Sequence, residues 1–298
     1  MKPFAYEAPT SVEEAVALLA TRGERARPLA GGTDLLVQLR QGRFDVDLLV
    51  DLKRIPELLT LTYDATAGLT VGAAVTCAVL AEHPDVRRMY PGLLDAASII
   101  GGTAIQGRAT LGGNLCNAAP SGDSIAAMIM LGASAVVAGP KGRREVPVAS
   151  FCTAPGRTVL QEGEIVVALK FPAPQPHTGA RYLRFIPRGE MDIAVAGAGA
   201  WVALTSDRAQ ISRARIALAA VAPTALDCPE AAAVLVGQAP EEPGFARAAA
   251  LAAEAARPID DTRGTAAQRR HLAAVLVKRA LQGAAERALA DDYPGKEV

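Results

Sequence analysis

Two glycine pairs, far apart in the chain, constrain its fold more than any other feature. The first lies in the run Leu29 to Leu35 (LAGGTDL) and the second in the run Thr110 to Leu115 (TLGGNL). Glycine tolerates positive φ and leaves no Cβ in the way of a ligand, and a neighbouring Thr, Asp or Asn can cap the helix that follows. Each pair therefore predicts a turn before a helix, with free helix N–H groups that suit a bound phosphate.

A single glycine pair is more often a plain turn than a phosphate site. Neither run matches G-x-G-x-x-G or G-x-x-x-x-G-K-[ST], so the spacing excludes the Rossmann fingerprint and the P-loop. The signal lies in the two pairs together with their polar neighbours. Two such turns could hold the two ends of one large cofactor, such as a dinucleotide.

The same runs resemble motifs of a known family. The FAD-binding medium subunits of the bacterial molybdenum hydroxylases, which include carbon monoxide and xanthine dehydrogenases, carry A-G-G-T/H-D/S-L and T-I/L-G-G-N-L. A Pro and an Asp follow the second motif, where this chain has Pro120 and Asp123. The run from Pro258 to Ala266, continuing to Arg269 and Arg270, is similar to the segment that opens the last helix of the family's C-terminal domain. The resemblance covers nearly the whole chain.

The resemblance implies an α+β fold with two domains. Residues 1–176 would form a two-lobed FAD-binding domain of the vanillyl-alcohol oxidase/p-cresol methylhydroxylase type, with subdomains at about 1–57 and 58–176. Residues 177–298 would form a C-terminal α+β domain with a small antiparallel sheet and helices. The stiff run at 172–176 (PAPQP) is the clearest linker in the chain, and the boundary is placed there.

The resemblance also implies non-covalent FAD, held by residues of both loops and of nearby segments. These are Leu29, Ala30, Gly31, Gly32, Thr33, Asp34, Leu35, Ile100, Thr110, Gly112, Gly113, Asn114, Asp123, Val166 and Arg184. No catalytic residue and no metal ligand is expected, because the flavin carries the redox chemistry.

Four of these residues have an ordinary structural alternative. Ile100 stands where eukaryotic xanthine dehydrogenases place an aromatic ring over the isoalloxazine, but it can equally be a core residue, as can Val166. Asp123 can cap a helix instead of meeting a polar edge of the cofactor. Arg184 stands roughly where the family often has a lysine near the flavin, and the alternative is an exposed strand cation.

By resemblance, the chain passes electrons from two [2Fe–2S] clusters in a small partner subunit, through FAD, to a quinone, NAD or oxygen. Substrate is hydroxylated at a molybdopterin centre in a large partner subunit, and a dimer of heterotrimers is expected. Two alternatives stay open: a free-standing FAD-dependent reductase or oxidase of the same fold, and a non-catalytic scaffold subunit.

Composition excludes several other functions. Lys plus Arg and Asp plus Glu number 31 each and only 4% of residues are aromatic, so neither nucleic acid nor an anionic membrane is an expected partner. Four scattered cysteines, without C-x-x-C spacing, predict no iron–sulfur cluster in this chain. The first residues contain no apolar signal segment and no run is long enough to span a bilayer, so a cytoplasmic protein is expected.

Hydrophobic periodicity predicts the elements around the two loops. Short strands are expected at 27–30 and 47–52, and a hairpin at 59–63 and 69–72. The expected helices are 35–40, 77–82, one continuous helix over 85–100, and another that ends near Leu131. Beyond the linker, apolar strand-like runs at 181–185, 193–204 and 211–220 precede an alanine-rich helical stretch and a long helix from Thr265.

Overall fold

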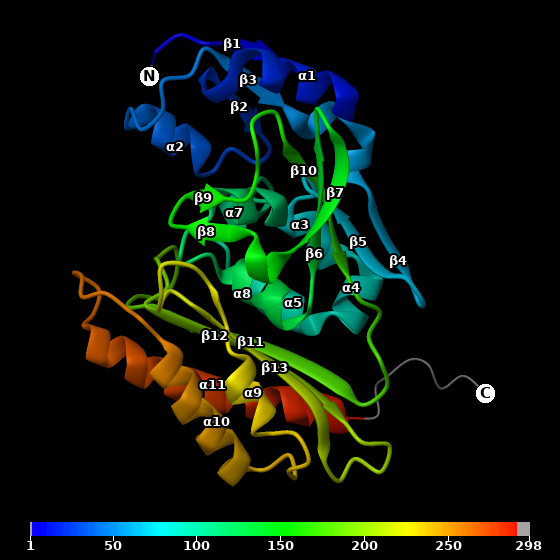
Figure 1. Ribbon diagram of the computed structural model, residues 1–298, viewed down its shortest axis with the longest axis vertical. Coiled ribbons are helices and arrows are strands. Elements are labelled where there is room, and N and C mark those ends of the chain that lie inside the picture. The colour runs from blue at the N-terminus through cyan, green and yellow to red at the C-terminus, as the bar shows by residue number, and fades with distance from the viewer. Residues whose placement is uncertain (1, 291–298) are drawn as a thin grey trace.

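The computed structural model describes residues 2–290, which form three layers along the long axis of the molecule (Figure 1). The N-terminal layer contains a parallel sheet in the order β1-β3-β2, formed by Ala5–Glu7, Leu48–Asp51 and Ala26–Leu29. Helix α1 (Val12–Arg22) packs its apolar face on this sheet, and Ser11 caps it by accepting a hydrogen bond from the Glu14 N–H. The shorter α2 (Leu35–Arg40) follows the first glycine pair.

The middle layer is built on an antiparallel sheet of five strands in the order β4-β5-β10-β6-β7. Their bounds are Leu61–Asp64, Gly68–Gly72, Ile165–Phe171, Ser134–Gly139 and Gly142–Pro147. The expected hairpin is confirmed as the antiparallel pair β4 and β5. The helices of this layer are α3 (Cys77–Glu82), α4 (Pro84–Met89), α5 (Pro91–Ala97), α6 (Thr103–Gln106), α7 (Leu111–Asn117) and α8 (Asp123–Met130); a small ribbon, β8 (Cys152–Ala154) and β9 (Arg157–Thr158), completes it.

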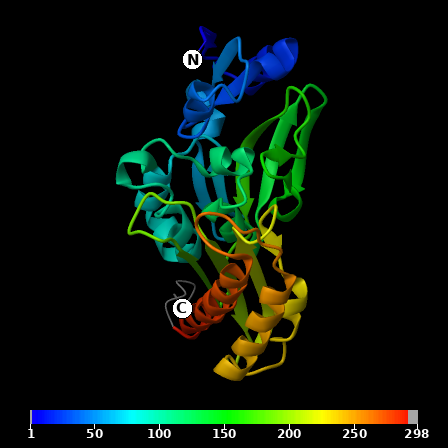
Figure 2. The same cartoon turned by 90° about the vertical axis from the view of Figure 1, so that its left-hand side faces the viewer.

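The C-terminal layer is a four-stranded antiparallel sheet, β11-β12-β13-β14, with helices on its outer face. The strands are Thr178–Phe185, Ala196–Leu204, Ile211–Ala219 and Leu226–Asp227, and the helices are α9 (Pro229–Ala233), α10 (Glu242–Ala255) and α11 (Ala266–Leu289). Helix α11 packs on β11 and β12, and α10 lies beside it, as Figure 2 shows from the side.

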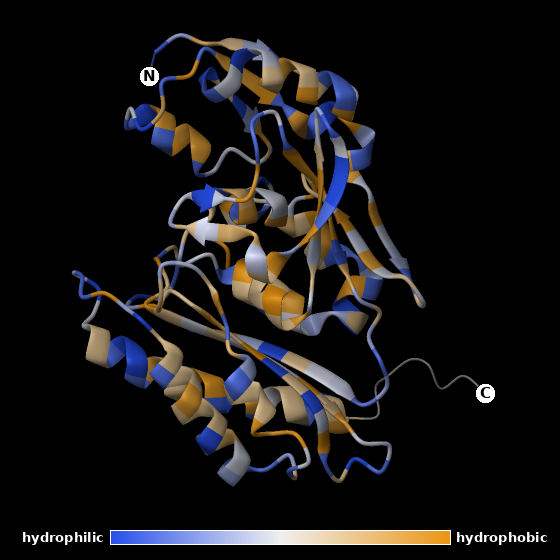
Figure 3. Cartoon of the chain, viewed as in Figure 1, coloured by the Kyte–Doolittle hydropathy of each residue, from blue (hydrophilic) through white to orange (hydrophobic). Residues whose placement is uncertain are grey.

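The sheet of the C-terminal layer is packed between helices on both faces. The inner face meets α5 and α8, and every residue of α8 is buried; Figure 3 shows α8 as largely hydrophobic between the two layers. Small residues allow the close approach. A Cβ on Gly199 would lie 2.6 Å from the Met130 sulfur, and one on Gly179 would lie 2.1 Å from the Ala284 carbonyl oxygen of α11. Close packing thus explains Gly179 in β11 and Gly199 in β12.

One expected helix was wrong. The stretch from Asp85 to Ile100 forms two helices, α4 and α5, which meet at Tyr90 with φ −128° and ψ 48°. Pro91 has no N–H to continue the first helix, and its ring disfavours helical backbone at the residue before it. Proline therefore begins a new helix here, although the apolar periodicity continues across the break.

Candidate functional site

A cleft of about 490 Å³ brings the two glycine pairs together between the N-terminal and middle layers. Most of the residues expected at a cofactor site line it: Ala30, Gly31, Gly32, Thr33, Asp34, Leu35, Ile100, Thr110, Gly112, Gly113, Asn114 and Val166. Leu29, Asp123 and Arg184 are not among the lining residues. The volume is in the usual range of small-molecule sites.

The first glycine pair forms a tight turn between β2 and α2. Gly32 has φ +78°, a left-handed conformation that favours glycine. Gly31 is required for a different reason, because a Cβ there would lie 2.0 Å from the Arg108 carbonyl oxygen. Asp34 stands at the start of α2, but its side chain makes no capping hydrogen bond, contrary to the expected cap.

The second glycine pair lies inside a helix rather than before one. Thr110 is the N-cap of α7 and accepts a hydrogen bond from the Gly113 N–H at 2.9 Å, so Gly112 and Gly113 form the first turn of that helix. Positive φ at this pair was therefore a wrong expectation. A Cβ on Gly112 would lie 2.6 Å from the Ala73 carbonyl oxygen, so close packing explains this glycine. Asn114 is not a cap; its side-chain oxygen accepts from the Ser124 hydroxyl at 2.7 Å.

Main-chain and side-chain contacts fix the position of the second loop. Thr110 pairs with Thr76 in an isolated antiparallel bridge, and the Cys77 N–H donates to the Ala109 carbonyl at 2.8 Å. Across the cleft, the Gln38 amide donates to the Asn117 side chain at 2.9 Å, which connects α2 to α7. A side-chain hydrogen bond therefore joins the two walls of the cleft.

Asp123 and Arg184 form a buried pair outside the cleft lining. One oxygen of Asp123 accepts from the Tyr182 hydroxyl at 2.7 Å, and the other lies 2.5 Å from the Arg184 guanidinium. Burial raises the pKa of Asp123, while the Arg184 charge and the Tyr182 hydroxyl oppose that rise. The Asp123 carboxylate therefore joins α8 to β11, and Arg184 is not an exposed strand cation. Leu29 is also buried, in a small core with Leu39 and its neighbours.

Apolar and polar side chains that no motif indicated also line the cleft. The Arg27 guanidinium lies 4.3 Å from the Phe44 ring centroid, a cation–π contact. Cys116 lines the cleft, and burial raises the pKa of its thiol to about 12. At neutral pH this thiol stays protonated and is a weak nucleophile. Nothing in the local sequence distinguishes these residues from ordinary core and surface positions.

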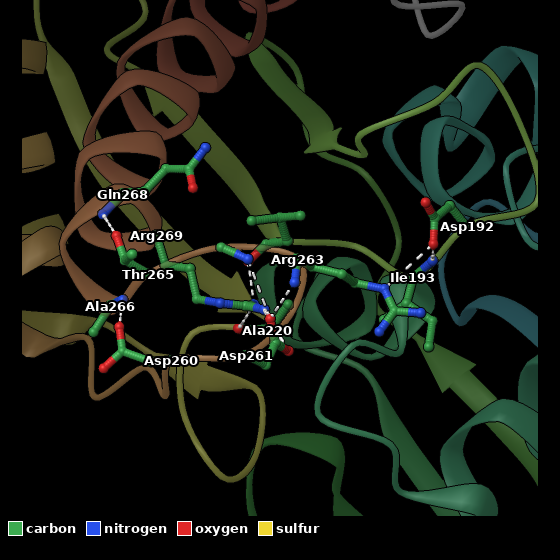
Figure 4. A network of polar contacts seen from close by, with 12 residues as sticks. Asp192, Ile193, Ala220, Asp260, Asp261, Arg263, Thr265, Ala266, Gln268 and Arg269 are labelled. Carbon is green, nitrogen blue, oxygen red and sulfur yellow. Dashed lines mark hydrogen bonds and ion pairs between the residues drawn. The ribbon is translucent and has the colours of Figure 1, made fainter.

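The third motif is a structural network at the start of α11 (Figure 4). Arg269 is 4% exposed and donates to the Val195 carbonyl at 2.7 Å, the Ala220 carbonyl at 3.1 Å and both oxygens of Asp261 at 2.8 Å. Thr265 caps α11 by accepting from the Gln268 N–H. A buried guanidinium bonded in this way fixes the ends of two strands against the last helix.

Residues 2–290 contain neither a group of metal-ligating side chains nor a helix that could span a membrane. No cluster of three or more His, Cys, Asp or Glu side chains that could hold a metal ion occurs there. Among these residues, no helix has the length and hydropathy needed to cross a bilayer.

Comparison with known proteins gives the same relatives over both parts of the chain. Residues 2–174 match the family described as the FAD-binding domain in molybdopterin dehydrogenase, and residues 181–284 match the CO dehydrogenase flavoprotein C-terminal domain. The carbon monoxide dehydrogenase medium chain of Hydrogenophaga pseudoflava is 36% identical over 94% of this chain and 96% of its own length. The xanthine dehydrogenase FAD-binding subunit of Escherichia coli O157:H7 is 37% identical over 76% and 77%. A solved chain of CO dehydrogenase from Oligotropha carboxidovorans superposes with a TM-score of 0.92 at 32% identity, covering 96% of this chain and 99% of its own.

Proposed function

This chain belongs to the FAD-binding subunits of the molybdenum hydroxylases, and from that premise we propose that its cleft holds the FAD of a multi-subunit oxidoreductase. The observation that carries the proposal is the meeting of the two glycine pairs on one cleft. When bound, FAD would accept electrons from an iron–sulfur partner and deliver them to an external acceptor.

The residues of the cleft fit a dinucleotide. Gly31 and Gly32 bring bare backbone to the cleft wall, and a side chain at Gly31 would have no room. Across the cleft, the first turn of α7 contains Gly112 and Gly113; the Thr110 hydroxyl takes the Gly113 N–H, which leaves the Gly112 N–H for a ligand. We assign the pyrophosphate to the space between these loops, because backbone N–H groups at a helix start bind phosphate oxygens well. No covalent attachment is expected, since the one cysteine among the cleft-lining residues has a strongly raised pKa.

We assign the flavin ring to the part of the cleft near Ile100 and Val166. Both are aliphatic, and Val166 is 3% exposed on β10. They would therefore give the flavin ring an apolar surface to pack against, but no aromatic ring to stack on. Leu29 would support the first loop from beneath. Asp123 and Arg184 would act by fixing β11 against α8 next to the site.

We place the domain boundary between residues 176 and 177, with 1–176 as the FAD-binding domain and 177–298 as the C-terminal domain. Two observations support it. The matched families end at 174 and begin again at 181, and the proline-rich run 172–176 connects β10 to β11.

We further propose a small [2Fe–2S] partner and a large molybdopterin partner, assembled as a dimer of heterotrimers in the cytoplasm. The acceptor is a quinone, NAD or oxygen. The matched CO dehydrogenase and xanthine dehydrogenase relatives support the partners, because they are named as a medium chain and an FAD-binding subunit. The chain contributes the electron outlet and does not choose the substrate.

The test is co-expression with neighbouring open reading frames that encode iron–sulfur and molybdopterin proteins. We expect a heteromeric complex by size exclusion with light scattering, flavin released by acid precipitation, and bleaching of the flavin when the substrate of the complex is added. A chain that never takes up FAD, or that oxidises a substrate without partners, would contradict the proposal.

A further inference from the structure

Two consecutive carbonyls of the first glycine turn are held by cations. The Lys53 ammonium donates to the Ala30 carbonyl oxygen at 3.0 Å. The Arg108 Nε–H donates a longer hydrogen bond, 3.4 Å, to the Gly31 carbonyl oxygen. Neither basic residue belongs to a recognised motif, and neither lines the cleft.

The Lys53 ammonium is fixed by a buried carboxylate. Asp51 is 5% exposed and accepts hydrogen bonds from the Lys53 ammonium, the Lys53 N–H at 3.0 Å and the Tyr6 hydroxyl. Burial alone pushes the pKa of Asp51 upward, but these hydrogen bonds outweigh it and hold the pKa below its usual value. The ammonium is therefore placed by a carboxylate that stays ionised at neutral pH, at the end of the central strand β3.

Because the peptides are planar, these carbonyl contacts also fix the direction in which the Gly31 and Gly32 N–H groups point. No peptide bond among the described residues is cis, and in a trans peptide the C=O and N–H point in opposite directions. Because Lys53 holds the Ala30 carbonyl, the Gly31 N–H points away from Lys53. Because Arg108 holds the Gly31 carbonyl, the Gly32 N–H points away from the guanidinium. Within residues 2–290, these two N–H groups donate none of the hydrogen bonds found in loops and caps.

We propose that Lys53 is a positioning residue for the anion-binding face of the first loop, with Arg108 as a weaker second support. This rests on the proposed function, since the anion is the FAD pyrophosphate. A carbonyl bonded to a cation polarises its own peptide, so the N–H of that peptide becomes a better donor to phosphate. The cations also set the orientation of the Ala30–Gly31 and Gly31–Gly32 peptides before the cofactor arrives, which lowers the cost of ordering the loop on binding.

The experiment is titration of flavin-free full-length protein with FAD, followed by flavin fluorescence, for wild type, Lys53→Met, Lys53→Arg and Arg108→Met. We expect Lys53→Met to weaken FAD binding about tenfold, or about 1.4 kcal/mol. Lys53→Arg should stay within about threefold of wild type, because it keeps a cationic donor. Arg108→Met should lose about threefold, in keeping with its longer bond. Lys2→Met, which breaks an exposed pair with Asp45 in the same layer, is the matched control and should bind like wild type.

Each outcome decides the proposal. Lys53→Met with wild-type affinity would overturn it, and so would an equal loss in Lys53→Met and Lys53→Arg, since packing and not charge would then be the cause. If Lys53→Met does not fold, Arg108→Met still tests the proposal, because Arg108 is exposed and its replacement should not prevent folding. An FAD affinity equal to wild type in Arg108→Met would then contradict the role of cations bound to these carbonyls. Failure of wild-type protein itself to bind FAD would contradict the proposed function instead.

Discussion

The two glycine pairs look alike in the sequence and are used differently in the structure. The first pair makes a turn, with Gly32 at φ +78°; Lys53 donates to the Ala30 carbonyl just before the pair, and Arg108 donates to the Gly31 carbonyl. The second pair forms the first turn of α7, with ordinary helical backbone and a threonine cap. The first loop depends on charged side chains that lie behind it, whereas the second depends on neighbouring main chain.

The pairs share one physical requirement, which is close approach of another backbone. Gly31 meets the Arg108 carbonyl and Gly112 meets the Ala73 carbonyl, both at distances that exclude a Cβ. A Cβ on the second glycine of each pair would meet side chains instead, those of Leu29 and Leu36 at Gly32 and the Thr110 hydroxyl at Gly113. In each pair, therefore, the first glycine is needed for packing and the second for backbone conformation or for access to the cleft.

The largest effect should come from Gly31→Ala. The new Cβ would overlap the Arg108 carbonyl oxygen at 2.0 Å, so the two loops must separate. We expect FAD affinity to fall at least about a hundredfold, since separated loops no longer close on one pyrophosphate. Fluorescence titration measures it. Gly107→Ala is the control, because a Cβ there meets nothing within 4 Å, and it should bind normally. Normal binding by Gly31→Ala would show that the loops do not depend on this contact.

Gly112→Ala should act mainly on stability. Its Cβ would lie 2.6 Å from the Ala73 carbonyl oxygen and 2.8 Å from the Ala73 Cα, both in backbone that cannot move aside cheaply. Overpacking of this kind costs about 1–3 kcal/mol. Denaturant unfolding of the flavin-free protein measures the loss. A variant as stable as wild type would contradict the argument that packing requires this glycine.

Gly113→Ala should separate binding from stability. Its Cβ would meet only the Thr110 hydroxyl, at 2.9 Å, and alanine favours a helix by up to about 1 kcal/mol over glycine. We therefore expect the free energy of unfolding to change by less than about 1 kcal/mol, while FAD affinity falls about tenfold because a methyl enters the cleft wall. Equal binding of FAD to wild type and variant would mean that this turn does not touch the cofactor.

The smallest effect should be on acid sensitivity, through Asp51 beside the first loop. The pKa of Asp51 is lower in the folded protein than in the unfolded chain, so the unfolded chain binds more protons in acid. The stabilisation by Asp51 is present above about pH 4 and is lost as the pH falls through the folded pKa. Asp51→Asn should remove this contribution, so its free energy of unfolding should fall less steeply than that of wild type as the pH drops below about 4. Parallel curves for wild type and Asp51→Asn would contradict the role of this carboxylate.

Local patterns in the sequence were enough for the short elements beside the cleft. Helices Leu35–Arg40 and Cys77–Glu82 have the expected bounds, because local signals act over only a few residues; Thr76 caps the second of them. The sequence also contains the signal for the helix break at Pro91, because the effect of proline on backbone conformation is local. At this position the local effect of proline overrides the hydrophobic periodicity.

The two motifs themselves were visible as sequence, and the family resemblance they carry was correct over both matched parts of the chain. A pattern of glycines shows only where side chains are absent, and this is a property of the sequence alone. It does not record what occupies the space. That Gly31 faces Arg108 and Gly112 faces Ala73 depends on segments brought together by the sheets.

Only the tertiary structure decided the partners of the charged residues. Lys53 and Arg108 are ordinary basic residues in the sequence, and Asp123 and Arg184 are far apart along the chain, yet the fold places each within hydrogen-bonding distance of a specific group. Backbone conformational preferences and hydrophobic periodicity act over a few neighbouring residues, so they can be recognised from the sequence alone. Ion pairs and carbonyl contacts depend on distances of about 3 Å between remote segments, and those distances exist only after the three layers have packed.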